Sequence, residues 1–176
     1  MNRLAEGRLQ VYTGSGKGKT TAALGLALRA LGRGLKVYII QFLKGRETGE
    51  SRVAARLAPG LTLRFFGQPG FGRLKSPGPE DRRLLGEAWD LAREVIRSGE
   101  HDLVILDEIN LALANELLPL SEVLEVLRHR PSHVEVVLTG RHAPPALLEL
   151  ADLVTEMHPL RHYLKAGVRA RAGIEW

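Results

Sequence analysis

Cysteine is absent from the sequence, and this absence excludes several kinds of chemistry at once. Without a thiol, the chain has no disulfide framework, no thiolate metal site and no cysteine nucleophile. No apolar run approaches the ~20 residues of a membrane-spanning helix. Residues 1–7 also lack the apolar core of a secretory signal. We therefore expect a cytoplasmic protein that has no membrane partner.

The sequence also has no concentrated block of charge, although it is basic overall. It contains 25 Lys and Arg residues against 20 Asp and Glu residues, which gives a formal net charge of +5. A nucleic-acid-binding protein gathers its basic residues on one face or along one helix. Here they are scattered along the chain, which favours a solvated surface with a few cations for an anionic ligand, and no nucleic-acid partner.

A glycine-rich loop is the most informative segment that the chain does contain. It lies between an apolar run and a helix-forming segment, which is the context of a polyphosphate-binding loop. The backbone N–H groups of such a loop converge on the anion, Lys19 supplies a mobile cation, and Thr20 offers a hydroxyl to Mg²⁺. We expect the nucleotide to contact the whole loop, namely Thr13, Gly14, Ser15, Gly16, Lys17, Gly18, Lys19, Thr20 and Thr21.

This loop departs from the common pattern in its length. Three residues separate Gly14 from Gly18, where four residues usually separate the first glycine from the final Gly-Lys-Ser/Thr. The loop is therefore either one residue short or begins on Thr13 in place of a glycine. Either way, we expect it to hold phosphates differently from the loop of an ordinary ATPase.

Apolar segments of strand type and helix type alternate along the rest of the chain. The predicted strands are Leu9–Thr13, Lys36–Phe42, Leu61–Phe66, Leu103–Leu106, Val134–Thr139 and Leu153–Met157. The predicted helices are Lys19–Leu31, Gly49–Leu57, Glu80–Ser98, Ser121–His129 and Pro144–Leu150, with Trp89 in the core and a loop over Gly67–Pro79. This order predicts one α/β domain over residues 1–176, with a mostly parallel twisted sheet covered by helices on both faces.

Candidate chemistry follows the predicted strands at their carboxyl ends, where parallel α/β sheets bind ligands. Asp107 and Glu108 end a buried strand, as expected of an acidic metal ligand beside a phosphate loop, although either residue also suits a helix cap. Arg141 follows another strand and suits a bidentate phosphate contact as well as a plain surface position. Gln41 and Lys44 follow the second strand, and Lys44 is equally well explained as a solvated loop residue.

Taken together, these motifs resemble one known family, the P-loop ATP:corrinoid adenosyltransferases. The resemblance begins with the short glycine-rich loop, whose Gly-x-Gly-Lys-Gly-Lys-Thr-Thr pattern is typical of the family. It extends over nearly the whole chain in the family's order, through Gln41–Gly45, Gly49-Glu50, Leu106–Asn110, Leu117–Leu120, Arg130-Pro131, Leu138–Arg141, Ala151–Met157 and Ala166–Trp176.

The resemblance implies a RecA-like fold and a reaction in adenosylcobalamin biosynthesis or salvage. In that reaction the Co(I) of a corrinoid attacks the 5′ carbon of ATP, and triphosphate leaves. Members of the family hold ATP reversed in the loop and act with Mg²⁺ or Mn²⁺. The resemblance thus implies that Lys19 and Arg141 stabilise the leaving group, and that Thr20 with Asp107 or Glu108 holds the metal ion. A homodimer and a reductase that supplies Co(I) are also implied.

Two departures from the family concern the corrinoid. Members often carry an aromatic pair after the third strand, whereas this chain keeps Phe71 and has Arg73 where tryptophan is common. Many members also have a longer segment before the loop that covers the site. We expect Phe71 and Arg73 to contact the corrinoid. The alternatives are a P-loop ATPase or small-molecule kinase, which would need an acceptor or a water-positioning group, and a nucleotide-sensing module.

Overall fold

The computed structural model describes residues 3–69 and 76–176 and has an α/β fold built on one parallel sheet. The strands are β1 (Leu9–Thr13), β2 (Val37–Gln41), β3 (Leu61–Phe65), β4 (Leu103–Asp107), β5 (Glu135–Thr139) and β6 (Leu153–Glu156). They lie in the order β3-β2-β4-β5-β1-β6, and each neighbouring pair is parallel. The predicted parallel sheet is therefore confirmed.

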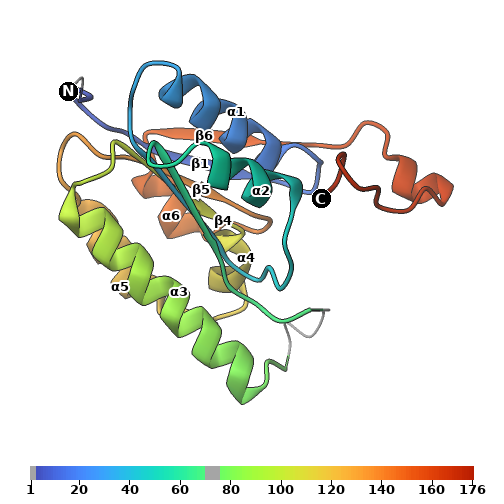
Figure 1. Cartoon of the computed structure of the whole chain (residues 1–176). Helices are drawn as coiled ribbons and strands as arrows, with labels where there is room; N and C mark the ends of the chain where they lie inside the picture. The colour runs from blue at the N-terminus through green and yellow to red at the C-terminus, as the bar shows by residue number, and fades with distance from the viewer. Residues whose placement is uncertain (1–2, 70–75) are drawn as a thin grey trace.

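Helices cover both faces of this sheet, as predicted. They are α1 (Lys19–Leu31), α2 (Gly49–Arg56), α3 (Pro79–Ser98), α4 (Ile109–Ala114), α5 (Leu120–Arg128) and α6 (Pro145–Leu150), with a 3₁₀ turn, η1, at Tyr163–Ala166. The buried alanines of α1 pack with one set of strand side chains, and α3 to α6 pack with the other (Figure 1). A central sheet buried on both faces explains why β4 reads as a continuous apolar run.

The structure differs from the sequence-based expectation mainly after β4. Helix α4 was not predicted, because it has only six residues, INLALA, and directly continues the apolar run of the strand. Glu108 separates the two elements with a left-handed backbone at φ 64°. Trp89 is 4% exposed in α3 and belongs to the core, as expected. Among the described residues, no helix has the length and apolarity needed to cross a membrane.

Sheet order decides which residues meet at the carboxyl edge. Strand β5 lies between β1 and β4. The glycine-rich loop after β1 (residues 13–21, the phosphate loop) therefore lies close to Asp107 at the end of β4, with Thr139, the last residue of β5, between them. Gln41 lies opposite Asp107 on the neighbouring strand β2. The fold therefore brings residues that are about a hundred positions apart in the sequence to one edge of the sheet.

Candidate active site

The phosphate loop, residues 13–21, is held against the backbone that follows β6. The Gly16 N–H donates to the Met157 carbonyl at 2.7 Å. A Cβ atom at Gly14 would lie 2.4 Å from that carbonyl oxygen, and one at Gly16 would lie 2.8 Å from it. Gly14 also has a positive φ of 94°, which favours glycine. Both glycines are therefore required by packing against the chain, independently of any phosphate.

Lys19 begins α1 and turns back over the loop. Its Nζ donates to the carbonyls of Gly14 and Gly16, at 2.7 Å each, and the residue is only 7% exposed. Burial lowers the pKa of this ammonium, while the charge of Glu108 acts in the opposite direction. The loop thus holds a cation at the cleft in advance, on neutral acceptors that a phosphate oxygen can replace.

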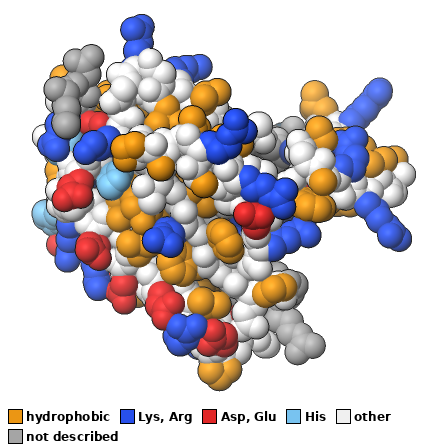
Figure 2. Space-filling model, viewed as in Figure 1, with side chains coloured by type: hydrophobic (Ala, Val, Ile, Leu, Met, Phe, Trp, Pro, Cys, Tyr) orange, Lys and Arg blue, Asp and Glu red, His pale blue; other side chains and the backbone are white. Residues whose placement is uncertain are grey.

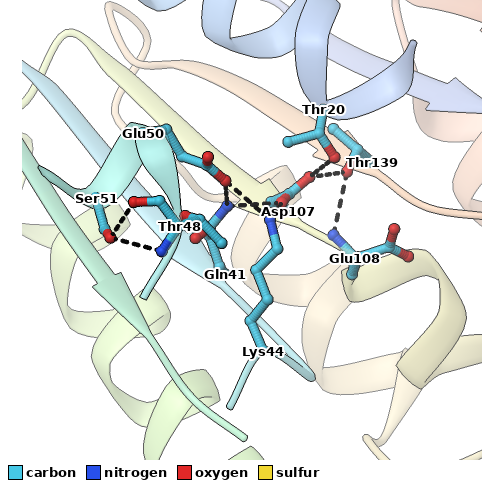
Figure 3. A network of polar contacts seen from close by, with 9 residues as sticks. All are labelled: Thr20, Gln41, Lys44, Thr48, Glu50, Ser51, Asp107, Glu108 and Thr139. Atoms are coloured by element: carbon cyan, nitrogen blue, oxygen red, sulfur yellow. Dashed lines mark hydrogen bonds and ion pairs between the residues drawn. The ribbon is translucent and has the colours of Figure 1, made fainter. Parts of the chain in front are cut away.

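Asp107 is the centre of a buried polar network at the ends of β4, β5 and β2 (Figure 3). Its Oδ1 accepts from the hydroxyls of Thr20 at 2.7 Å and Thr139 at 2.6 Å. Its Oδ2 accepts from Gln41 Nε2 at 3.0 Å and pairs with Lys44 Nζ at 3.5 Å. With 1% exposure and donors on both oxygens, Asp107 is a fixed acceptor that orients the Thr20 hydroxyl.

Glu50, near the start of α2, extends this network from the other side. Its Oε1 accepts from Gln41 at 2.9 Å and pairs with Lys44 at 3.0 Å. Burial alone would raise the pKa of Glu50, but the Gln41 hydrogen bond and the Lys44 charge lower it to about 2. The Lys44 ammonium is therefore held between two carboxylates, Glu50 and Asp107, with its head group at the cleft.

Glu108 differs from its neighbour Asp107 in the direction of its side chain, in its hydrogen bonds and in its position at the cleft (Figure 3). Its backbone N–H donates to Thr139 Oγ1 at 3.1 Å, and the left-handed backbone turns its side chain away from Asp107 (Figure 3). Within the part of the chain that the structure describes, no hydrogen bond reaches its carboxylate, which lines the cleft. Burial, and then the charge of Asp107, raises the pKa of Glu108. A cation bound in the cleft would stabilise the ionised carboxylate and so offset the cost of burying its charge.

The cleft has a volume of about 570 Å³ and lies between the phosphate loop and the C-terminal residues. Of the residues predicted for the site, those that line it are Gly16, Lys17, Gly18, Lys19, Thr20, Thr21, Lys44, Glu108 and Arg141. Thr13, Gly14, Ser15, Gln41 and Asp107 are not part of its lining. Thr13 and Gln41 are buried, and Gln41 supports the site through its hydrogen bonds to Asp107 and Glu50. Phe71 and Arg73 lie outside the described residues.

Comparison of the sequence with known proteins identifies the family of this chain. The family model described as ATP:corrinoid adenosyltransferase BtuR/CobO/CobP matches residues 5–176. The chain belongs to this family. It is 40% identical to a corrinoid adenosyltransferase of Escherichia coli K12, over 97% of this chain and 86% of that protein. It is 39% identical to one of Pseudomonas aeruginosa, over 97% and 84%, and 38% identical to one of Salmonella typhimurium, over 97% and 86%.

Several residues of this adenosyltransferase site were not among those predicted from the sequence. Thr139 ends β5 beside Asp107, and Glu50 follows β2 after a short loop, so position after a strand was a usable signal for both. Tyr163, Glu175 and Trp176 also line the cleft. These three follow the last strand in a segment without sheet or helix periodicity, and only the folded chain brings them back to the phosphate loop.

Proposed function

We propose that this member of the family transfers the 5′-deoxyadenosyl group of ATP to the Co(I) of a corrinoid and releases triphosphate. An electron pair on cobalt forms the cobalt–carbon bond, and the bond between C5′ and the triphosphate oxygen breaks with its pair on the leaving group. Family membership supports the reaction class. The observation that carries the proposal is the cleft itself, where four cations, Lys17, Lys19, Lys44 and Arg141, surround a space next to the phosphate loop.

These cations suit a reaction whose leaving group gains charge. The nucleophile is the substrate's own metal, so the protein needs to orient ATP and stabilise the departing triphosphate, without a general base. We assign this stabilisation to Lys19 and Arg141. Lys19 would exchange its two carbonyl acceptors for phosphate oxygens, and Arg141 would add a planar donor from the end of β5. The short glycine-rich loop is compatible with ATP bound in the opposite orientation to that in ordinary P-loop ATPases.

A divalent ion, Mg²⁺ or Mn²⁺, fits the residues at the cleft. Hydroxyl and carboxylate oxygens are the donors that such ions prefer, and Thr20 and Glu108 present one of each. Because the oxygens of Asp107 already accept from four groups, we propose that Glu108 holds the ion with Thr20, while Asp107 orients the Thr20 hydroxyl. When bound, the ion would neutralise charge on the triphosphate oxygens.

The finer features of the biological setting are also proposals. We propose that the protein acts in the cytoplasm as a homodimer, in the biosynthesis or salvage of adenosylcobalamin, with a reductase that supplies the electron for Co(I). Sedimentation of the purified protein would test the dimer directly.

The deciding experiment is to incubate the protein with ATP, Mg²⁺ and a chemically reduced cobalamin and to follow the cobalt spectrum. We expect a cobalt–carbon bond and one equivalent of triphosphate, with little ADP. Stoichiometric ADP release would instead support the alternative, a P-loop ATPase or kinase, which shares the phosphate loop and Asp107. Nucleotide binding without any turnover would support a nucleotide-sensing module.

A further inference from the structure

The chain after β6 forms a C-terminal strap, residues 158–176, which leaves the sheet, turns through η1 and returns to the phosphate loop (Figure 1). Just before the strap, Met157 is fixed to the loop by the Gly16 N–H. Close to its end, Glu175 pairs with Lys17 Nζ at 3.2 Å, and the Ile174 carbonyl accepts from the same ammonium at 3.1 Å. Both ends of the strap are therefore attached to the phosphate loop.

Within the strap, Glu175 gathers several donors. It accepts from the Arg171 backbone N–H at 2.7 Å, from the Tyr163 hydroxyl and from the Arg171 guanidinium. The hydrogen bonds from Arg171 and Tyr163 lower the pKa of this carboxyl, so it is ionised at neutral pH. The carboxylate thus holds the fold of the strap together and joins it to the loop. Its partner Lys17 is, in turn, a cation of the phosphate loop.

Trp176 occupies a particular place in this arrangement. The guanidinium of Arg46, which follows β2, lies 4.3 Å from the centre of its ring, within cation–π range. The residue is 37% exposed, so part of the ring remains open to a ligand. It lines the cleft beside the phosphate loop and also a second hollow of about 680 Å³, which Gly45 and Gln68 help to form.

Three residues are common to the linings of both hollows: Lys44, Glu175 and Trp176. Adenosyl transfer needs two substrates to meet at one carbon atom, because cobalt must approach C5′ on the side opposite the leaving triphosphate. If the triphosphate occupies the cleft at the loop, the meeting point lies toward the wall that the two hollows share. A tryptophan ring supplies a large, flat and rigid apolar surface there.

The strap that carries Trp176 has an excess of basic side chains. Figure 2 shows the C-terminal segment as a lobe beside the main body, with Lys and Arg side chains projecting from it. Four exposed basic residues belong to the strap, namely Arg161, Lys165, Arg169 and Arg171. Such a lobe favours the approach of a polyanion such as ATP and leaves the apolar contact to the aromatic residue at its end.

On the basis of the proposed function, we infer that Trp176 is a substrate-binding residue that packs against the corrinoid where it meets ATP, and that Glu175 is the positioning residue that holds it there through Lys17. The ring would contact the macrocycle from the second hollow, and the ion pair would keep the strap closed over the loop. The ligand class is therefore a flat amphiphilic macrocycle next to a nucleoside triphosphate.

The test compares Trp176→Ala, Trp176→Phe and Leu160→Ala with the wild-type protein. Leu160 is a matched control, because it is a 98% exposed apolar residue of the same strap and lines neither hollow. Trp176→Ala should raise the KM for the reduced cobalamin about tenfold, as expected for loss of a large aromatic contact. The Kd for Mg-ATP, measured by calorimetry, should stay within about twofold, because among the described residues no hydrogen bond joins the Trp176 side chain to the phosphate loop, whose contacts to the strap come from Glu175 and the Ile174 carbonyl. Trp176→Phe should restore most of the loss.

A second readout does not depend on turnover. The chain has two tryptophans, and Trp89 is buried in the core. The tryptophan fluorescence of the wild type minus that of Trp176→Phe, here called the difference emission, therefore reports on Trp176. We expect an oxidised cobalamin to quench this difference emission at saturating concentrations and inorganic triphosphate to leave it nearly unchanged. The absorption of light by cobalamin itself is corrected with the Leu160→Ala and Trp176→Phe proteins.

The outcomes separate this inference from the proposed function. If the wild type forms the cobalt–carbon bond but Trp176→Ala keeps its cobalamin KM and the difference emission is not quenched, the inference is wrong and the function stands. If the wild type forms no such bond, the function is wrong.

The positioning role of Glu175 has its own test. Glu175→Gln should raise the cobalamin KM about two- to threefold, as expected for a partly exposed ion pair. The double variant Glu175→Gln with Lys17→Met should have nearly the same KM as Glu175→Gln alone. Additive losses would overturn that role.

Discussion

The two sides of the cleft are built in opposite ways. On the sheet side, Asp107 is buried and accepts from Thr20, Thr139 and Gln41, so its position is fixed by neighbouring strands. On the other side, the C-terminal strap is mostly exposed, and an ion pair of Lys17 with Glu175 joins it to the loop. Buried hydrogen bonds to a carboxylate hold their partners in fixed positions, whereas ion pairs that are partly exposed contribute little to stability and are screened by salt.

This contrast suggests a division of labour. Under the proposed function, the sheet side would present preorganised groups to the triphosphate and the divalent ion, as electrostatic stabilisation of a leaving group requires. The strap side places the partly exposed ring of Trp176 at the cleft, which suits a wall that contacts a large substrate. Changes on the sheet side should therefore affect chemistry and folding, and changes on the strap side should affect substrate binding.

The largest expected effect separates two lysines of the same loop. Lys19→Ala should lower kcat by roughly 10²–10³, because removing one preorganised contact to a developing charge costs ~3–4 kcal/mol. Lys17→Ala, the comparison variant in the same loop, should lower kcat to a much smaller extent, since the Lys17 ammonium is already paired with Glu175 of the strap. Rates of cobalt–carbon bond formation at saturating substrates measure both. Equal losses in the two variants would remove the distinction between the sides.

The next effect concerns stability. Asp107→Asn should lower the free energy of unfolding by about 2 kcal/mol, because the new amide places donors against the donors of Gln41 and Lys44. Glu175→Gln should lower the urea midpoint much less, since its ion pair with Lys17 is partly exposed and the amide oxygen of glutamine can still accept hydrogen bonds. Urea denaturation followed by circular dichroism gives both values. A stable Asp107→Asn protein would contradict the rigid-network interpretation.

Glu108 offers a test within the sheet side. Glu108→Gln should raise the Mg²⁺ concentration needed for half-maximal activity about tenfold, as expected for loss of a charged ligand. Because its pKa is raised in the folded protein, ionisation of Glu108 destabilises the fold as pH rises through that pKa, and the penalty is absent below the ordinary value of 4.5. Without metal, the variant should therefore have a higher Tm at pH 7 and an unchanged Tm at pH 3. A lower Tm at pH 7 would contradict the unpaired carboxylate.

Glu50 should show the opposite pH dependence. Its pKa is lowered from 4.5 to about 2, so its ionised form stabilises the fold above pH 4.5, and this contribution is lost as pH falls toward 2. Glu50→Gln should cost about 1 kcal/mol at pH 7, a value reduced for partial exposure, and progressively less below pH 4.5. Thermal unfolding of both proteins across this pH range measures the difference in their stability. A difference of the same size at all pH values would contradict the prediction.

The smallest expected effect belongs to the strap. The affinity for Mg-ATP of Lys17→Met and Glu175→Gln, alone and combined, defines their coupling through a double-mutant cycle. We expect a small coupling in dilute buffer that disappears near 1 M salt, where the Debye length is about 3 Å. A large, salt-independent coupling would mean that the strap is as rigidly held as the Asp107 network.

Much of the fold was accessible from the sequence because it depends on local patterns. The helix Lys19–Leu31 and the strand Leu9–Thr13 were predicted with the bounds that the structure shows. Most other elements differ by one or two residues at their ends, where fraying and capping decide. Helix α4 was missed, because a six-residue apolar helix next to an apolar strand has no distinct period.

The sequence by itself determined the glycine-rich loop between a strand and a helix, the alternation of strands and helices, and the acidic pair Asp107-Glu108 after an apolar run, since each is a local pattern. It left open which of the two carboxylates lines the cleft. Only the tertiary structure decided that, because the order of strands supplies Asp107 with its donors and the left-handed backbone turns Glu108 into the cleft. The return of Trp176 to the cleft was likewise decided by tertiary contacts, among them the ion pair of Lys17 with Glu175, two residues more than 150 positions apart.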